Sequence, residues 1–126
     1  MWSESTQYTY ATHLDVYYPP LTIVDTPALV SNCQDSWYNQ TLCRVNESVV
    51  RLGAVQGEYH WHKHERGDEF FFVLDGQLFV DLEERSIALA PRQGLVVSKG
   101  LLHRTRAPTR TVILMIETAT ILPTGD

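Results

Sequence analysis

The sequence contains no apolar run near the roughly 20 residues that a membrane-spanning helix needs. A basic balance is also missing, because 10 Lys and Arg face 15 Asp and Glu and leave a net charge of −5. Phosphate binding requires a basic footprint, so we expect neither nucleic acid nor a membrane as a partner. The first residues show neither the basic stretch nor the apolar core of a signal peptide, so we expect a cytoplasmic protein.

Cysteine is scarce, with Cys33 and Cys43 as its two occurrences. Their spacing matches no zinc motif, and a cytosolic protein keeps such thiols reduced. We therefore expect both side chains to be free and to serve packing. The sequence also lacks a recognisable serine–histidine–acid arrangement or phosphate-binding loop, which sets aside the chemistries that depend on them.

Long helical patterns are absent, and β structure takes their place. From residue 48 onward, short segments rich in β-branched and aromatic residues alternate with turn signals. We predict strands over 48–55, 59–64, 70–74, 77–82, 86–90, 95–98, 103–106 and 111–117. Strands at intervals of roughly 8–12 residues are typical of an all-β sandwich or barrel. The pair Asp75-Gly76 between two apolar runs predicts a hairpin.

We expect residues 1–35 to form an N-terminal extension and residues 36–126 to form one barrel domain. The extension has no clean period, and Pro19-Pro20 prevents a helix across it. Residues 21–24 are expected to form a short edge strand, and residues 36–40 a helical turn. Because the edges of a small barrel need cover, we predict a homodimer in which residues 17–30 pack on the partner's sheet.

The chemistry concentrates between residues 57 and 76. His60, His62 and His64 lie two residues apart, and alternate residues of a strand share a face, so their imidazoles are expected to point the same way. The same alternation sends Tyr59 and Trp61 to the outside of the barrel or to an interface. Two imidazoles at this spacing can converge on one ion.

Two further residues complete a metal-ligand set. Glu69 begins the next strand after a short loop, so an antiparallel return brings its carboxylate back to His62 and His64. His103, on a later strand, is the obvious fourth donor. Three imidazoles and one carboxylate suit one divalent ion of iron, manganese, nickel or zinc and leave two octahedral positions open. Calcium and magnesium prefer all-oxygen shells.

These residues resemble the motifs of the cupin superfamily. His62, His64, Glu69 and Gly76 follow the first motif, and residues 94–103 resemble the second, with serine at position 98 where many relatives have proline. Within the superfamily, the chain is most similar to small single-domain cupins called mannose-6-phosphate-isomerase-like. The likeness covers roughly the last three quarters of the chain. It implies a double-stranded β-helix with a jelly-roll-like barrel, and it does not establish sugar isomerisation.

Two classes of function are compatible with an open metal site. The first is an enzyme that acts on a small oxygen-bearing metabolite as an isomerase, epimerase, cyclase, lyase or dioxygenase. The second is a non-catalytic module that binds or senses a small ligand. For an enzyme, the candidate bases are His60, on the same strand face as the ligands, and Glu117, at the end of an apolar strand.

Several arginines lie near these residues in the sequence. The default expectation for the three that follow His103 is a solvated edge, and the alternative is an anion clamp near the metal, since guanidinium groups suit carboxylate and phosphate. These residues are Arg104, Arg106 and Arg110. Arg51, on an otherwise apolar strand, is a second candidate, which could reach into the cavity instead.

Overall fold

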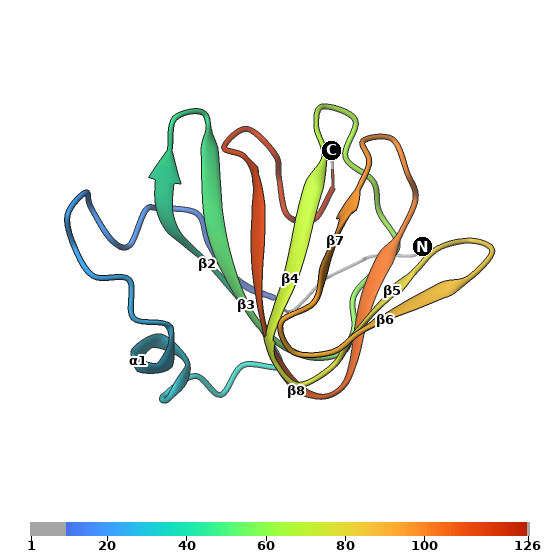
Figure 1. Cartoon of the computed structure of the whole chain (residues 1–126), viewed down its shortest axis with the longest axis horizontal. Helices are drawn as coiled ribbons and strands as arrows, with labels where there is room; N and C mark the ends of the chain where they lie inside the picture. The colour runs from blue at the N-terminus through green and yellow to red at the C-terminus, as the bar shows by residue number, and fades with distance from the viewer. Residues whose placement is uncertain (1–9, 126) are drawn as a thin grey trace, which may run out of the picture.

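Strands make up about half of residues 10–125, the part of the chain that the computed structural model describes (Figure 1). The eight strands are β1 (Ala11–His13), β2 (Trp37–Val45), β3 (Ser48–Glu58), β4 (Glu69–Asp75), β5 (Leu78–Asp81), β6 (Ser86–Leu89), β7 (Gly94–Val97) and β8 (Arg104–Thr118). The one described helix is α1 (Thr26–Val30). No helix within residues 10–125 has the length and apolar character that crossing a membrane requires. The all-β prediction is confirmed.

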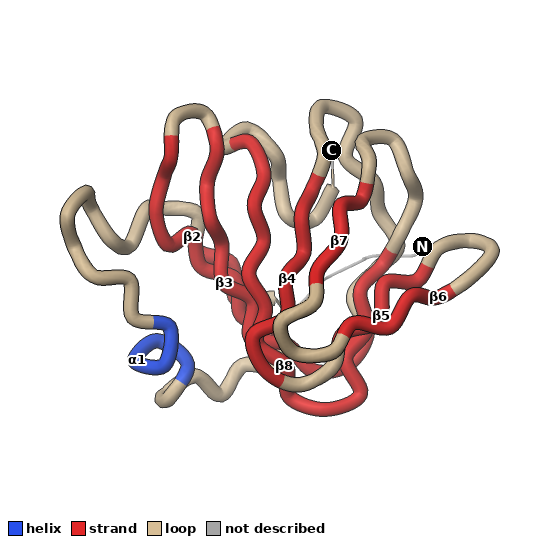
Figure 2. Tube along the Cα trace, viewed as in Figure 1, coloured by secondary structure: helices blue, strands red, loops and turns tan. Residues whose placement is uncertain are grey.

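The long strand β8 organises the sheet. The strands follow the order β1-β2-β3-β8-β4-β7, and β5 pairs with both β6 and β8. Residues 104–106 of β8 pair with β5, whereas residues 112–116 pair with β4, so two different strands share one side of β8. The strands wrap around one interior and form the predicted double-stranded β-helix, drawn in red in Figure 2.

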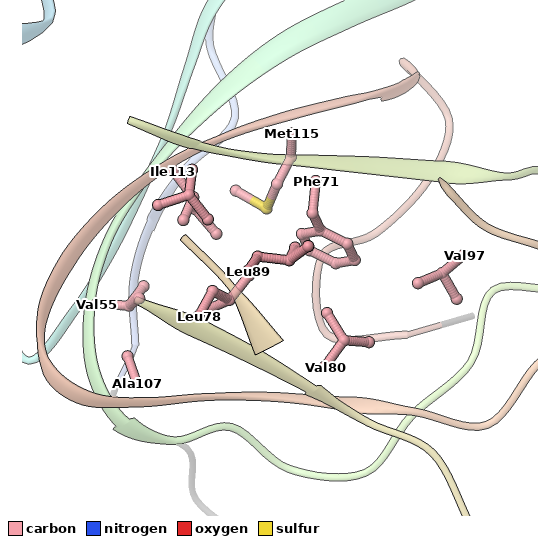
Figure 3. Close-up of a cluster of buried hydrophobic side chains, with 10 residues drawn as sticks. Val55, Phe71, Leu78, Val80, Leu89, Val97, Ala107, Ile113 and Met115 are labelled. Carbon is pink, nitrogen blue, oxygen red and sulfur yellow. The ribbon is translucent and has the colours of Figure 1, made fainter. Parts of the chain in front are cut away.

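Apolar side chains fill this interior. Figure 3 shows Phe71 of β4 and Met115 of β8 on the inner side of the barrel, close to Ile113. The buried cluster comprises Val55, Phe71, Val73, Leu78, Val80, Leu89, Val97, Ala107, Ile113 and Met115. Side chains alternate between the two faces of a strand, so the residues of β2 and β3 that lie between the inward-facing ones point outward. There Leu42 and Leu52 form a second cluster with Tyr18.

Tight turns join neighbouring strands. Asn46, at a φ of 54°, joins β2 to β3, and the Leu82 N–H donates to the Arg85 carbonyl between β5 and β6. The hairpin predicted at Asp75-Gly76 is wrong, because β4 and β5 do not pair with each other. Gly76 has a φ of 91° and carries the chain along β8 from the partner region of β4 to that of β5.

The N-terminal segment lies along the outer side of β2, together with α1 (Figure 1). Strand β1 pairs with β2 in parallel, and the Tyr17 and Tyr18 N–H groups donate to the carbonyls of Thr41 and Leu42. Residues 21–24 form no strand, and residues 37–40 belong to β2 rather than to a helical turn. Both local predictions are wrong. Pairing with β3 decides the conformation of β2, whose aromatic and β-branched residues favour strands.

Candidate metal centre

The backbone leaves strand geometry just before the histidines. Gly57 has a φ of 102°, and the register with β8 shifts between Val55 and Gly57. In the predicted strand 59–64, only His62 makes a β-bridge, to His103, through two N–H···O=C bonds of 2.9 Å. That prediction of a continuous strand is therefore wrong.

The irregular backbone changes where the neighbouring aromatic residues lie. Trp61 is 42 % exposed and carries the Arg104 guanidinium 5.2 Å above its ring, which agrees with the predicted outward position. Tyr59 was expected on the same outer face, but it is buried inside and its ring centroid lies 4.7 Å from that of Trp37. The prediction for Tyr59 is wrong because strict two-residue alternation ends at Gly57.

The four predicted ligands meet in one place. One ligand atom from each of His62, His64, Glu69 and His103 lies within 4.8 Å of the other three. Glu69 opens β4, and its Oε1 atom is 3.3 Å from His64 Nε2 and 3.5 Å from His103 Nε2. All four side chains are buried.

Two backbone carbonyls orient the rings. His62 Nδ1 lies 3.0 Å from the His60 carbonyl, and His103 Nδ1 lies 2.9 Å from the Leu101 carbonyl. A carbonyl only accepts, so each Nδ1 carries the proton and each Nε2 presents a lone pair. Glu69 Oε1 and His103 Nε2 are buried and make no hydrogen bond with any residue of the described range. This donor set fits a divalent metal ion.

Burial keeps the site in the protonation state that a metal requires. Removal from water lowers the pKa of His62 to about 4, so its imidazole is neutral at physiological pH. Burial alone raises the pKa of the Glu69 carboxyl, but the rings of His103 and His64 beside it outweigh this and hold the pKa well below its usual range. Neutral imidazoles and an ionised carboxylate are the forms that bind metal.

The two candidate bases lie next to this cluster and outside the set of four. The His60 ring is 5.1 Å from that of His62, between centroids. Its Nδ1 lies 3.1 Å from the Tyr10 hydroxyl and its Nε2 2.7 Å from the Thr124 carbonyl. His60 thus joins the N-terminal and C-terminal segments at the edge of the site.

Glu117 is buried next to Glu69, close enough to lower the pKa of that carboxyl. Its Oε2 atom accepts a 2.5 Å hydrogen bond from Arg51, which also donates to Thr41 Oγ1 and to the Ile121 carbonyl. Arg51 therefore forms a buried ion pair inside the barrel, but it is not among the residues that line the neighbouring cavity.

The remaining arginines are held away from the metal ligands. Arg104 and Arg106 both donate to Asp81, at 2.9 and 3.0 Å, and Arg106 also lies 4.4 Å from the Phe79 ring centroid. Arg110 donates to backbone carbonyls that include that of Asp35. The anion clamp considered from the sequence is wrong, and the solvated edge describes these residues better.

A cavity adjoins the metal cluster. It is small, about 30 Å³ in volume, and opens to solvent. Metal ligands His62 and Glu69 line it together with aromatic residues that the sequence analysis did not assign to the site: Tyr10, Trp37, Tyr38, Tyr59 and Phe71. The N-terminal tyrosines carry no periodic signal, so pairing of β1 with β2, which places Tyr10 there, could not be read from the sequence.

Comparison with known proteins identifies the family. Residues 48–117 match the model of the cupin domain, which spans more than half of the chain. The chain is 38 % identical over 91 residues to the uncharacterized protein YdbB of Bacillus subtilis (strain 168). The aligned residues cover 71 % of this chain and 80 % of that protein. The chain belongs to the cupin family.

Solved structures agree with this assignment. A cupin-2 domain containing protein from Shewanella frigidimarina superimposes with a TM-score of 0.72 at 27 % identity, over 76 % of this chain and 94 % of that one. A protein from Neisseria meningitidis gives a TM-score of 0.69 at 23 % identity, over 76 % and 98 %, and shows the fold alone. Similarity to the mannose-6-phosphate-isomerase-like group stays a prediction.

Proposed function

We propose that this cupin is an enzyme that uses one divalent transition-metal ion, held by His62, His64, Glu69 and His103, on a small oxygen-bearing metabolite. The observation that carries the proposal is the buried cluster of four converging ligand atoms beside a cavity. Iron, manganese, nickel and zinc all suit the donor set. When bound, such an ion acts as a Lewis acid toward substrate oxygens or, if it is iron, supports dioxygen chemistry.

The protein groups around the cluster have separate tasks in this proposal. The carbonyls of His60 and Leu101 keep the Nε2 atoms of His62 and His103 turned inward. The Arg51–Glu117 ion pair holds a second carboxylate beside Glu69. Apolar walls exclude water from the substrate and strengthen each electrostatic contact there.

Proton transfer requires a base, and His60 and Glu117 are the proposed candidates. Each already has a partner: Tyr10 and Thr124 for His60, and Arg51 for Glu117. Either residue would exchange such a contact for the substrate during turnover. These occupied contacts favour the second candidate function, a non-catalytic cupin that binds or senses a small ligand.

Metal content tests the first part of the proposal. We expect wild-type protein expressed with supplemented metal to carry close to one ion per chain by elemental analysis. His103→Ala should lose most of it, because three ligands remain around a buried site. The matched control is His60→Ala, which removes a neighbouring imidazole outside the cluster and should retain the metal. A wild type without metal, or equal losses in both variants, contradicts the proposal.

Turnover separates the two function classes. Oxygen consumption with a bound substrate marks a dioxygenase, whereas deuterium uptake from solvent without oxygen consumption marks an isomerase or lyase. His60→Ala should lower turnover and shift the pH profile while the metal content stays intact, if His60 is the base. Absence of turnover across keto acids, sugars and diketones with each of the four metals favours the ligand-binding alternative over the enzyme.

A further inference from the structure

The structure leaves no room for a metabolite beside the metal cluster. The ligand atoms Glu69 Oε1, His64 Nε2 and His103 Nε2 are buried and out of reach of solvent. The adjoining cavity, at about 30 Å³, has room for about two water molecules. An ion or a substrate therefore reaches the ligands only if part of the surrounding wall moves.

The segment that follows β8 is a part of this wall that no strand pairing holds. The chain turns back after Thr118 (Figure 1), and Pro123 lines the cavity together with the ligands His62 and Glu69. Residues 119–125 belong to no strand or helix. A segment without such a hydrogen-bond ladder opens at a lower free-energy cost than the sheet around it.

Ile121 anchors the near end of this segment. Its side chain is 1 % exposed, and its carbonyl accepts a 3.0 Å hydrogen bond from Arg51. The side chain also packs against Gly67, in the loop between the ligands His64 and Glu69, because a Cβ atom at Gly67 would lie 3.3 Å from Ile121 Cδ1. The chain is therefore fixed as far as Ile121.

Beyond this anchor, side chains next to the metal ligands hold the segment by its backbone. The Tyr59 hydroxyl donates to the Pro123 carbonyl at 3.4 Å. His60 Nε2 lies 2.7 Å from the Thr124 carbonyl, and it carries the proton because a carbonyl only accepts. The Tyr59 and His60 rings lie 5.2 and 5.1 Å from that of His62, between centroids. Two hydrogen bonds beside the metal cluster thus keep the segment in place.

Gly125 packs the segment directly onto a metal ligand. A Cβ atom at Gly125 would lie 2.9 Å from His62 Cβ, 3.6 Å from His62 Cγ and 3.3 Å from the Lys63 carbonyl. Gly125 also has a φ of 111°, which L side chains rarely adopt. Any other residue at this position is therefore strained and pushes the backbone away from His62.

We propose that residues 122–125 form a strap, hinged at Ile121, that closes the metal centre and must move away before an ion or a substrate can enter. This inference rests on the proposed function and adds an opening step to it. Opening also releases the Tyr59 hydroxyl and His60 Nε2 from the strap carbonyls, so that both groups can turn to an oxygen atom of the substrate. The closed strap keeps the candidate base His60 occupied.

Zinc entry and zinc release test the strap, because both require it to open. Gly125→Ala pushes the backbone off His62, and His60→Ala removes the hydrogen bond to the Thr124 carbonyl. Each variant destabilises the closed strap in metal-free and zinc-loaded protein alike. We expect both rates to rise roughly fivefold, the value of one net hydrogen bond, with the zinc affinity unchanged. A fluorescent zinc indicator follows entry, and capture by a chelator follows release.

Thr124→Ala is the matched control. It trims an exposed side chain of the strap but keeps the carbonyl that His60 contacts, so both rates should equal those of the wild type. Faster release without faster entry in Gly125→Ala and His60→Ala would mean that the segment only supports the ligands. Unchanged rates in both variants would mean that it is no barrier. Either result overturns the inference.

Amide hydrogen exchange of the metal-free protein tests the strap without zinc and keeps the result apart from the proposed function. Gly125→Ala should speed exchange in residues 122–125 roughly fivefold and leave residues 112–118 of β8 unchanged, because the chain up to Ile121 stays in place. Equal exchange of residues 122–125 in wild type and variant overturns the strap. Wild type that takes up no zinc contradicts the metal centre itself.

Discussion

Asp81 holds two cationic side chains on the outer side of the second half of the barrel. Its Oδ2 atom accepts from the Nε atoms of Arg104 and Arg106, and its Oδ1 atom accepts from Arg106 Nη2 at 3.0 Å and from Ser86. The fork of Arg106 above all, and then Ser86 and Arg104, holds the pKa of Asp81 well below its usual range. One carboxylate thus joins β5, β6 and β8.

We expect Asp81→Asn to lower the free energy of unfolding by roughly 2 kcal/mol, because two partly buried guanidinium groups lose their shared counter-charge. The control is Glu58→Gln, which removes an exposed partner of Arg104 and should cost about 0.5 kcal/mol or less. Urea denaturation at pH 7 measures both. Comparable losses in the two variants would show that Asp81 contributes no more than a surface charge.

The pH dependence of Asp81 has a defined direction. A carboxyl whose pKa is lower in the folded state stabilises the fold above its unfolded pKa of about 4, and this contribution is lost as the pH falls below that value. Wild type should therefore lose stability more steeply than Asp81→Asn below pH 4. Parallel pH profiles would contradict this assignment.

His62 produces a second pH dependence, at higher pH. The unfolded chain takes up a proton near pH 6.5, but the buried imidazole takes it up only near pH 4. Metal-free protein should therefore lose stability as the pH falls from 6.5 to 4, by about 3 kcal/mol from His62, and this contribution of His62 should level off below pH 4. Urea titrations in the presence of a chelator measure this. His62→Asn should flatten the profile in that window, whereas the exposed His13→Asn should leave it unchanged.

At the scale of elements, Gly76 fixes the crossing from one half of the barrel to the other. Besides its positive φ, it packs directly against Thr111, whose side chain accepts from the Gln77 N–H and donates to the Gln77 carbonyl. A methyl group at Gly76 would collide with Thr111 and with the Arg110 carbonyl, both of which belong to β8. The turn therefore tolerates no side chain.

We expect Gly76→Ala to destabilise the protein by about 3 kcal/mol, the sum of backbone strain and a clash with β8. Gly100→Ala is the matched control. Gly100 also has a positive φ of 79°, but a methyl group there lies 3.6 Å from the end of the Glu65 side chain, so strain of about 1 kcal/mol remains. Thermal and urea unfolding give both values. Equal costs would mean that the contact with Thr111 has no energetic weight.

The same elements show what a sequence can predict here. Alternating β-branched residues and the histidine spacing predict most strands and the four converging ligands, because both signals are local or repeat at a fixed period. The crossing at Gly76 is not local: the turn chemistry of Asp-Gly fits a hairpin, and only the choice of β8 as common partner excludes one. Tyr59 and Tyr10 depend on a register shift and on the pairing of β2, which no single segment encodes.

The segment between β1 and α1 exposes several apolar side chains on the surface of the molecule. Leu21 and Ile23 are almost fully exposed, and Tyr17 and Val24 are exposed as well. Within its own chain this segment contacts β2 through the Tyr17 and Tyr18 N–H groups, which leaves these side chains on its outer surface. Adjacent exposed apolar residues of this kind mark interaction surfaces.

We therefore predict a homodimer in which this segment packs on the partner chain. The double substitution Leu21→Asp with Ile23→Asp should shift the protein to a monomer by light scattering, because charge at the interface is costly to desolvate. Circular dichroism and metal content should stay unchanged, since neither side chain is buried in its own chain. The control is Val96→Asp, an equally drastic change at an exposed position of the edge strand β7, which should leave the dimer intact. A monomeric wild type contradicts the prediction, and dissociation by Val96→Asp alone would place the interface at β7 instead.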